Sequence, residues 1–377
     1  MLSLLFVSAA AFALASPLPA SFSDNQIDLV KARLAESASH SWEIGTRATA
    51  LLELEGPSLF VYSQGSTPPP KIYASTGGDV FKIVDDVLAK RAAGNCLPFF
   101  CDGSAGDPAS IGIPDLIRNW THPSPTSNSS SSTAAIDQLH YLIDIVPRLP
   151  DGAISHRSPP QPVQLWSDFL SMAPPFIAYY GALHNNKSLL LEAYNQIKTY
   201  RYHLTVDDDS GLLQHIVLGK SGSDPGHWAT GNGWAASGML RVLRIIQSSA
   251  FAEDLLDEQA DIISWASSLL NTVWQYQQPD GSLLNYIDLS PRNTFPDASG
   301  TALLAASTFR LATILPGSVD TGAAERARKW IGANIDKDGW LTNVVNPLNW
   351  HKPGSHSPEG QAFVLMLAAA YRDFSLV

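Results

Sequence analysis

Apolar residues recur at three- and four-residue intervals along most of the chain, which is the pattern of amphipathic helices. It predicts helices over 25–37, 79–93, 134–146, 189–202, 233–246, 260–277, 300–312 and 323–335. Long stretches of alternating apolar and polar residues, the signature of half-buried strands, are absent. The Pro-, Ser-, Thr- and Asn-rich tract 121–133 predicts an exposed loop. We therefore expect an all-α protein.

A short motif recurs four times, each time after a predicted helix. It contains Asp-Gly or Ser-Gly followed by a short alternating stretch, and its glycines are Gly152, Gly211, Gly281 and Gly339, spaced 59, 70 and 58 residues apart. Glycine adopts positive φ at little cost, so each motif predicts a turn followed by a short extended piece.

The interval between these motifs fits a unit of two helices and their loops, and six such units account for the length of the chain. Helical hairpins bury a shared core by stacking on their neighbours. Six hairpins closed into a ring form an (α/α)6 toroid, and an open helical array is the alternative. We predict one such barrel domain over residues 21–377, with short β-pieces in its loops.

Composition excludes several function classes. The chain has 24 Lys and Arg against 35 Asp and Glu, a net charge of −11, which disfavours nucleic acid and an anionic membrane surface as partners. It lacks a Gly-rich phosphate loop, a Gly-x-Ser-x-Gly elbow and a His-Glu-x-x-His motif, and its ten histidines are scattered. We therefore expect neither a metal nor another cofactor.

The first fifteen residues are apolar and end in Ala13-Leu14-Ala15, a small-x-small cleavage pattern. This stretch is too short to span a bilayer, so it predicts a signal peptide over residues 1–15, with residue 20 as the latest cleavage point, and an extracellular protein. In an oxidising compartment Cys96 and Cys101 are expected to form a local disulfide of modest stabilising effect, two buried thiols being the alternative. Glycosylation sequons begin at Asn119, Asn128 and Asn186.

Four segments gather aromatic, acidic and small residues near predicted helix starts. In segment 164–176, Asp168 stands between Trp166 and Phe169. Burial there is expected to raise the pKa of its carboxyl and make it a proton donor. The alternative is a purely structural role as a helix N-cap.

The other three segments are 227–238, 295–302 and 356–363. In the first of them, Trp228 and Trp234 can stack on a sugar ring or pack in the core. The last two have the residues of capped helix starts, and the amides of 295–302 could face an anion. Inner helices of a toroid all start near one end, so the four segments together predict a carbohydrate site.

In this order the segments resemble glycoside hydrolase family 105, the unsaturated rhamnogalacturonyl hydrolases, and more distantly family 88. The family pattern W-x-D-x-x-x-M-x-x-P-F is matched at 166–176, and R-G-N-G-W at 230–234. Its E-T-S-G-T-A, P-E-G-Q-A and D-G-x-x-x-H elements are matched at 297–302, 358–362 and 151–156. The family fold is the (α/α)6 toroid, in agreement with the repeat.

The resemblance implies hydrolysis of short oligosaccharides that end in a 4,5-unsaturated uronic acid. An acid protonates C4, water adds at C5, and the resulting hemiketal opens to release the neighbouring sugar. By matching position, Asp168 is the acid/base and Asp107 the second acid, with Asp115 as its alternative. The substrate contacts that we expect are His156, Trp166, Met172, His227, Trp228, Asn232, Trp234 and Ser299.

Three positions depart from the family pattern. Thr230 stands where the family has Arg, and the milder changes are Asp297 for Glu and Ala298 for Thr. A guanidinium binds a carboxylate bidentately, so the loss of this Arg removes the obvious partner of a uronate. Arg157, His227 and Lys220 are candidate replacements.

We therefore predict a secreted, monomeric hydrolase of unsaturated uronyl oligosaccharides from pectin-like material. The alternatives are an (α/α)6 glycosidase of different sugar specificity and a non-catalytic carbohydrate-binding toroid.

Overall fold

The computed structural model describes residues 22–63, 65, 67–68, 78–122, 130–205, 211–219 and 222–377. The α-helices are α1 (Asp24–Ser37), α2 (Ser41–Glu55), α3 (Gly78–Gly94), α4 (Gly112–Thr121), α5 (Ser130–His140), α6 (Phe169–Met172), α7 (Pro174–Leu183), α8 (Lys187–Leu204), α9 (Ala229–Ser248), α10 (Leu256–Trp274), α11 (Ala298–Ile314), α12 (Thr321–Ala333) and α13 (Pro358–Phe374). The shorter elements are the helical turns η2 (Asp107–Ile111), η3 (Tyr141–Ile145) and η4 (Ala252–Asp254), and the strands β1 (Leu165–Trp166), β2 (Ile216–Val217), β3 (Val345–Asn346) and β4 (Asn349–Pro353).

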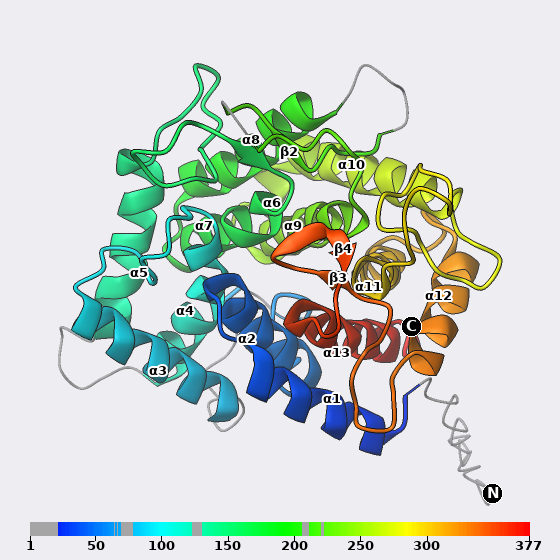
Figure 1. Ribbon diagram of the computed structural model, residues 1–377. Helices are drawn as coiled ribbons and strands as arrows, with labels where there is room; N and C mark the ends of the chain where they lie inside the picture. Colours follow the sequence, from blue (N-terminus) through cyan, green and yellow to red (C-terminus); the bar gives the residue numbers. More distant parts are fainter. Residues whose placement is uncertain are drawn as a thin grey trace, which may run out of the picture.

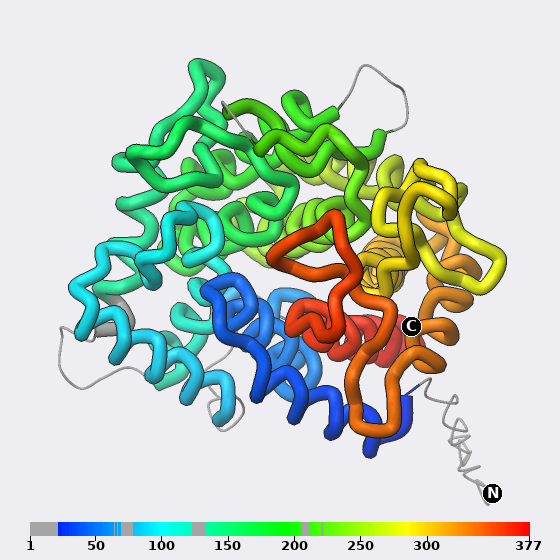
Figure 2. Tube along the Cα trace, viewed as in Figure 1, coloured from blue at the N-terminus to red at the C-terminus, as the bar shows by residue number. Residues whose placement is uncertain are grey.

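Six inner helices form a closed ring. Helices α2, α4, α7, α9, α11 and α13 contact one another in this order, and α13 contacts α2 again (Figure 1). Helices α1, α3, α5, α8, α10 and α12 pack against the outside of this ring. Figure 2 shows how the first helix, α1, lies beside the last, α13, where the ring closes. The predicted (α/α)6 toroid is confirmed, and the open array is excluded.

The inner helices are buried nearly all round, as α9 and α11 show. Glycines permit the closest approaches between them. A Cβ atom at Gly238 would lie 2.0 Å from the carbonyl oxygen of Leu170, so only glycine lets α9 pass so near α6. Likewise a Cβ at Gly300 would lie 2.7 Å from the backbone nitrogen of Thr230, which brings the starts of α11 and α9 together.

The eight predicted helices are present, with ends shifted by a few residues. The prediction over 134–146 covers two elements, because α5 ends at His140 and a π-helical turn follows. The loop predicted over 121–133 is wrong at both ends, since Thr121 ends α4 and Ser130 begins α5; residues 123–129 lie outside the described residues. The sequence analysis did not predict helices α2, α4, α6, α7 and α13.

The repeated glycines make the turns that the sequence predicts. All four have positive φ, of 96°, 72°, 100° and 89° for Gly152, Gly211, Gly281 and Gly339. Short bridges follow three of them, such as Arg148 to Ile154 and Ile335 to Leu341. These turns are the source of the short β-pieces expected in the loops.

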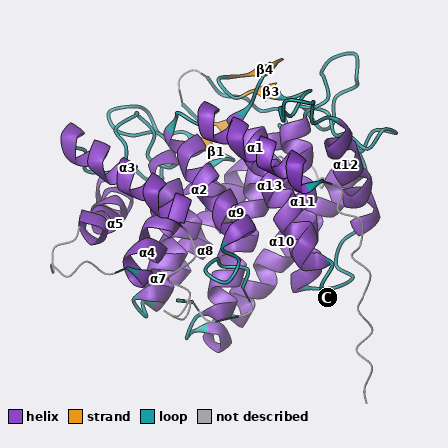
Figure 3. Ribbon diagram, turned by 90° about the horizontal axis from the view of Figure 1, so that it is seen from below, coloured by secondary structure: helices purple, strands orange, loops and turns teal. Residues whose placement is uncertain are grey.

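Two antiparallel pairs complete the fold. In the pair of β1 and β2, Leu165 lies opposite Val217 and Trp166 opposite Ile216. The β3–β4 hairpin lies at the end of the ring where the inner helices start, and the C-terminus lies at the other end (Figure 3).

Cys96 and Cys101 form the predicted disulfide in the loop after α3, with Cα atoms 5.8 Å apart. Within the described ranges, no helix combines the length and the apolar character needed to cross a bilayer. The predicted signal peptide and the sequon at Asn128 lie outside these ranges.

Candidate active site

Two carboxyl groups lie together where the inner helices start. Asp107 opens η2, directly before α4, and Asp168 directly precedes α6. Their side chains are largely buried, 14% and 16% exposed. Although Asp168 occupies a helix N-cap position, its side chain makes no capping hydrogen bond. A helix-capping role therefore does not explain Asp168, and its carboxyl is available for chemistry.

Pairing between loops from different repeats assembles this site. Because β1 and β2 are antiparallel, the residue after β1 lies beside the residue before β2, and the Ser167 amide donates to the carbonyl of His215 at 2.9 Å. In the same way, the amide of Ala105 donates to the carbonyl of His156 at 2.8 Å, which holds the Asp107 loop against the first repeat turn. Residues far apart in sequence thus meet at one end of the ring.

Asp107 is set up to hold a proton. Burial, reinforced by the nearby negative charges of Asp102 and Asp168, raises its pKa to about 8. The nearest imidazole nitrogen, Nε2 of His156, lies 3.5 Å from Oδ1 of Asp107. Burial lowers the pKa of His156 to about 3, so its ring is neutral and does not offset the carboxyl. Asp107 is therefore protonated at neutral pH.

Asp168 has the opposite protonation state. Burial acts to raise its pKa, but a hydrogen bond from His215 and the charge of that imidazole hold it below its usual value. Ser167 also donates to its Oδ2 at 3.2 Å. The expectation that aromatic surroundings raise the pKa of Asp168 is wrong, because a histidine from the next repeat lies beside it. Paired groups with opposite pKa shifts are typical of acid–base sites.

His215 lies between two carboxylates. Its Nε2 is 3.4 Å from Oδ2 of Asp168 and its Nδ1 is 3.0 Å from Oδ2 of Asp224. Although burial lowers the pKa of His215, the two carboxylates raise it above its usual value. Tyr286 donates to Asp224 at 2.6 Å and fixes the outer end of this chain of groups. The sequence analysis missed His215, even though it stands four residues after Gly211, as His156 does after Gly152.

Aromatic rings surround the two acids. Trp166 stacks on His156 with centroids 4.9 Å apart, and Trp228 lies tilted against His215 at 4.4 Å. Trp350, on β4, presents its ring at a steep angle to both Trp166 and His215, at 5.6 and 4.8 Å. The sequence analysis missed Trp350, which only the β3–β4 hairpin brings to this cluster. The expected Trp166 and Trp228 contact the histidines that lie beside the acids.

Three other expected contacts lie away from open surface. Trp234 and Met172 are 2% and 3% exposed, and Trp234 packs edge-on against Phe363 in the core. Asn232 is fully buried, and its side-chain amide hydrogen-bonds to the backbones of Leu213 and Trp228. The contacts within the protein give these side chains a structural role, and their part in sugar binding stays a prediction.

The remaining candidates, His227, Ser299 and Asp115, are all buried. His227 is bound to Asp288 through Nδ1 at 2.8 Å, and its buried Nε2 has no partner among the described residues. Ser299 is buried in the first turn of α11, where its backbone amide donates to Asp297. Asp115 is fully buried inside α4, so Asp107, which interacts electrostatically with Asp168, is the better second acid.

Two of the departures from the family pattern, Thr230 and Asp297, contact each other. The Thr230 hydroxyl donates to Oδ2 of Asp297 at 2.8 Å, and both side chains are fully buried. Burial raises the pKa of Asp297 to about 6, and the Thr230 hydrogen bond opposes this shift. Thr230 is thus committed to the protein interior.

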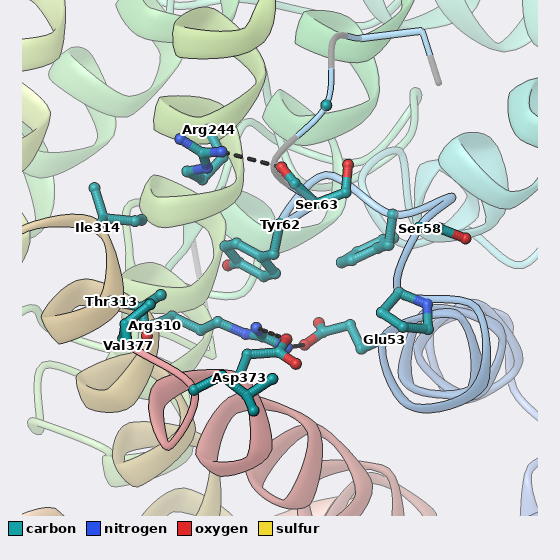
Figure 4. Close-up of a pocket in the computed structure, with 14 residues that line it drawn as sticks. Glu53, Ser58, Tyr62, Ser63, Arg244, Arg310, Thr313, Ile314, Asp373 and Val377 are labelled. Atoms are coloured by element: carbon teal, nitrogen blue, oxygen red, sulfur yellow. Dashed lines mark hydrogen bonds and ion pairs between the residues drawn. The ribbon is translucent and has the colours of Figure 1, made fainter. Parts of the chain in front are cut away.

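A separate cavity of about 650 Å³ lies at the opposite ends of α2, α9, α11 and α13 (Figure 4). There Arg310 reaches between Glu53 and Asp373 and lies 4.3 Å from the centroid of the Tyr62 ring. Helix C-termini carry partial negative charge, which a buried arginine offsets. We interpret this network as structural. No group of three or more His, Cys, Asp or Glu in the described ranges is arranged to hold a metal ion.

The chain is similar to known proteins over most of its length. Residues 116–351 match the family model described as Glycosyl Hydrolase Family 88. The structure resembles that of a possible member of family GH105 from Salmonella enterica serovar Paratyphi A, with 18% identity, a TM-score of 0.73 and coverage of 97% of this chain and 99% of the other. A possible member of the same family from Klebsiella pneumoniae has 17% identity and a TM-score of 0.73. The match covers 98% of this chain and 99% of the other.

An unsaturated glucuronyl hydrolase responsible for glycosaminoglycan degradation, from Bacillus sp. GL1, has 15% identity and a TM-score of 0.63, over 91% of this chain and 94% of the other. No curated protein matches the chain. At these identities the structural likenesses establish the fold, and the family model establishes the kinship.

Proposed function

The chain belongs to glycosyl hydrolase family 88, and from this premise we propose that it hydrolyses oligosaccharides ending in a 4,5-unsaturated uronic acid. The observation that carries the proposal is the pair of adjacent carboxyl groups, Asp107 protonated and Asp168 ionised, at one end of the ring. One group can give a proton while the other accepts one, as hydration of a double bond requires.

The protonation states suggest the division of labour. Asp107 donates its proton to C4 of the enol ether, and positive charge develops at C5 and the ring oxygen. Asp168, oriented by His215, removes a proton from the water that adds at C5. The resulting hemiketal opens to a C5 ketone and leaves a hemiacetal at C1, which expels the neighbouring sugar. One water is consumed, and proton exchange with solvent restores the pair.

This assignment refines the role expected from sequence, in which Asp168 served as the acid. The carboxyl beside His215 is ionised, so it is better suited to be the base. The two groups titrate as a coupled pair, and a substrate lying between them changes both pKa values. Replacing each acid separately tests whether both are needed, and the two limbs of the pH profile distinguish donor from base.

We also propose that the protein is secreted and acts on pectin-derived material outside the cell. The Cys96–Cys101 disulfide supports this, because disulfides persist mainly in oxidising compartments. The apolar segment at residues 1–15 supports it from sequence.

Ultraviolet absorbance tests the proposed activity, because the conjugated double bond absorbs and its hydration removes the signal. Lyase-generated rhamnogalacturonan and homogalacturonan oligosaccharides serve as substrates, and saturated oligosaccharides of equal length, analysed by released reducing ends, serve as the control. We expect loss of absorbance with the wild type and none with Asp168→Asn or Asp107→Asn. Cleavage of saturated oligosaccharides alone would instead identify an ordinary glycosidase.

A further inference from the structure

A uronate carries a carboxylate next to the reacting double bond, so a site for it needs a positive partner that is free to bind. Thr230 cannot take this part. It has no charge, is fully buried, and gives its hydroxyl hydrogen to Asp297. The partner must come from another element near Asp107 and Asp168.

The histidines near the acids are already engaged or neutral. His215 lies between the carboxylates of Asp168 and Asp224, whose negative charges face both of its nitrogens and oppose the approach of a substrate anion. His156 is neutral because burial lowers its pKa to about 3. His227 uses Nδ1 for Asp288, and its Nε2, which has no partner among the described residues, is a single donor that cannot grip a carboxylate bidentately. Lys220, a further candidate from sequence, lies outside the described residues.

Arg157 differs from all of these. It follows His156, and its backbone pairs with Ser104 in the loop that carries Asp107. Its guanidinium carbon lies 4.4 Å from the centroid of the Trp166 ring, and its side chain is only partly buried. Across the described part of the chain, its guanidinium forms no ion pair with a carboxylate. Its charge nevertheless reaches Asp107, whose pKa it lowers.

We propose that Arg157 binds the carboxylate of the unsaturated uronic acid and thereby makes the enzyme select acidic over esterified sugars. The inference rests on the proposed function and names the residue that sets its specificity. Contact with the Trp166 ring restrains the guanidinium. Its N–H groups, which make no hydrogen bond to the described residues, can bind a carboxylate bidentately.

The same placement links binding to catalysis. A free Arg157 favours the ionised form of Asp107. A substrate carboxylate bound to Arg157 offsets that charge, so Asp107 keeps its proton in the complex. Recognition of the acid group therefore helps to hold the proton donor in its active state.

The test crosses two changes, one in the enzyme and one in the substrate. An unsaturated oligosaccharide and its methyl ester at the terminal uronate are compared as substrates of the wild type and of Arg157→Gln. For each enzyme we calculate the ratio of kcat/KM for the acid to kcat/KM for the ester. We expect this acid-to-ester ratio to be about 10- to 100-fold higher for the wild type than for Arg157→Gln, mainly because KM for the acid rises in the variant. The difference in intrinsic reactivity between acid and ester is the same for both enzymes. It therefore cancels when the acid-to-ester ratio of the wild type is divided by that of Arg157→Gln.

Arg201→Gln is the matched control. Arg201 also lies over a tryptophan, 4.8 Å from the centroid of Trp265, but on the outer helices α8 and α10. We expect its acid-to-ester ratio to equal that of the wild type. Arg157→Lys keeps the positive charge but cannot form two parallel hydrogen bonds to a carboxylate, so we expect an intermediate acid-to-ester ratio. If Arg157→Gln does not fold, the comparison is made with Arg157→Lys.

The outcomes separate the two proposals. An unchanged acid-to-ester ratio in Arg157→Gln, or in Arg157→Lys if that variant alone folds, overturns the role of Arg157 while the proposed function stands. Absence of turnover of both acid and ester by the wild type overturns the proposed function, and with it this inference. A changed pH profile with an unchanged ratio would show that Arg157 acts only on Asp107.

Discussion

Nε2 of His215 lies 3.4 Å from Oδ2 of Asp168, although the two residues belong to different repeats. The β1–β2 pairing brings them together, and Asp224 holds the other nitrogen of the ring. The imidazole therefore keeps Asp168 ionised and fixes its direction. Most of the expected behaviour of the site follows from this contact.

His215→Gln is expected to lower kcat by about 100-fold or more, in the range by which positioned acid–base groups act. His215 holds the pKa of Asp168 down, so its loss raises that pKa. The acid limb of the kcat/KM profile should move to higher pH. A lower rate with an unmoved acid limb would mean that His215 does not act through Asp168.

The alkaline limb is expected from Asp107. Its pKa is raised to about 8, so the donor loses its proton above that pH and the activity of the wild type falls. The limb is measured as kcat/KM between pH 6 and 10, a range set by the pKa of about 8. Activity that persists unchanged well above pH 8 would exclude Asp107 as the proton donor.

Asp107→Asn should also stabilise the fold at neutral pH. A carboxyl whose folded pKa lies above its unfolded value favours the folded state only when protonated, so its cost grows with pH between about 4 and 8. We expect a higher Tm for the variant at pH 8 and no difference near pH 4. An equal Tm at both pH values would show that Asp107 is not held in an unfavourable environment.

Trp350→Ala is expected to raise KM by about tenfold while the fold stays intact, because truncation of a buried aromatic contact costs about 1–2 kcal/mol in binding. The ring contacts both Trp166 and His215. Trp265→Ala, on the outer helix α10, is the control and should leave KM unchanged. Equal KM values for the two variants would place Trp350 outside the binding site.

Thr230→Val should destabilise the protein by about 1–3 kcal/mol, because the buried carboxylate of Asp297 loses a donor. The pKa of Asp297 is about 6, so the loss should be larger above that pH and shrink below it. Thr199→Val is the control, since the hydroxyl of this half-buried residue donates to the carbonyls of Asn195 and Gln196 in its own helix. Denaturant unfolding at pH 5 and 8 measures the free energy of unfolding of both variants. An equal loss in Thr230→Val at the two pH values would show that the effect does not depend on Asp297.

The sequence predicts most of the fold because its signals are local. The turn at Gly152 depends on one residue's φ angle, and the Cys96–Cys101 bridge spans six residues. The segment around Asp168 is equally local. These features need no knowledge of how distant parts of the chain pack.

What sequence reasoning missed depends on contacts between repeats. The pKa of Asp168 is set by His215, and Trp350 reaches the site only through the β3–β4 hairpin. Trp234 was expected at the sugar because it follows the Gly-Asn-Gly segment, yet α9 turns it toward Phe363. The direction in which a helix faces its neighbours is a property of the closed ring.

The most direct test of the central claim is isotope labelling in the reaction itself. Turnover of an unsaturated oligosaccharide in D₂O is followed by NMR at early times, with the isolated product in D₂O as the control for exchange. We predict one deuterium at C4 of the released uronic acid, with one configuration, because an acid delivers the proton there. Release of the neighbouring sugar with the double bond intact and no deuterium at C4 would contradict the account.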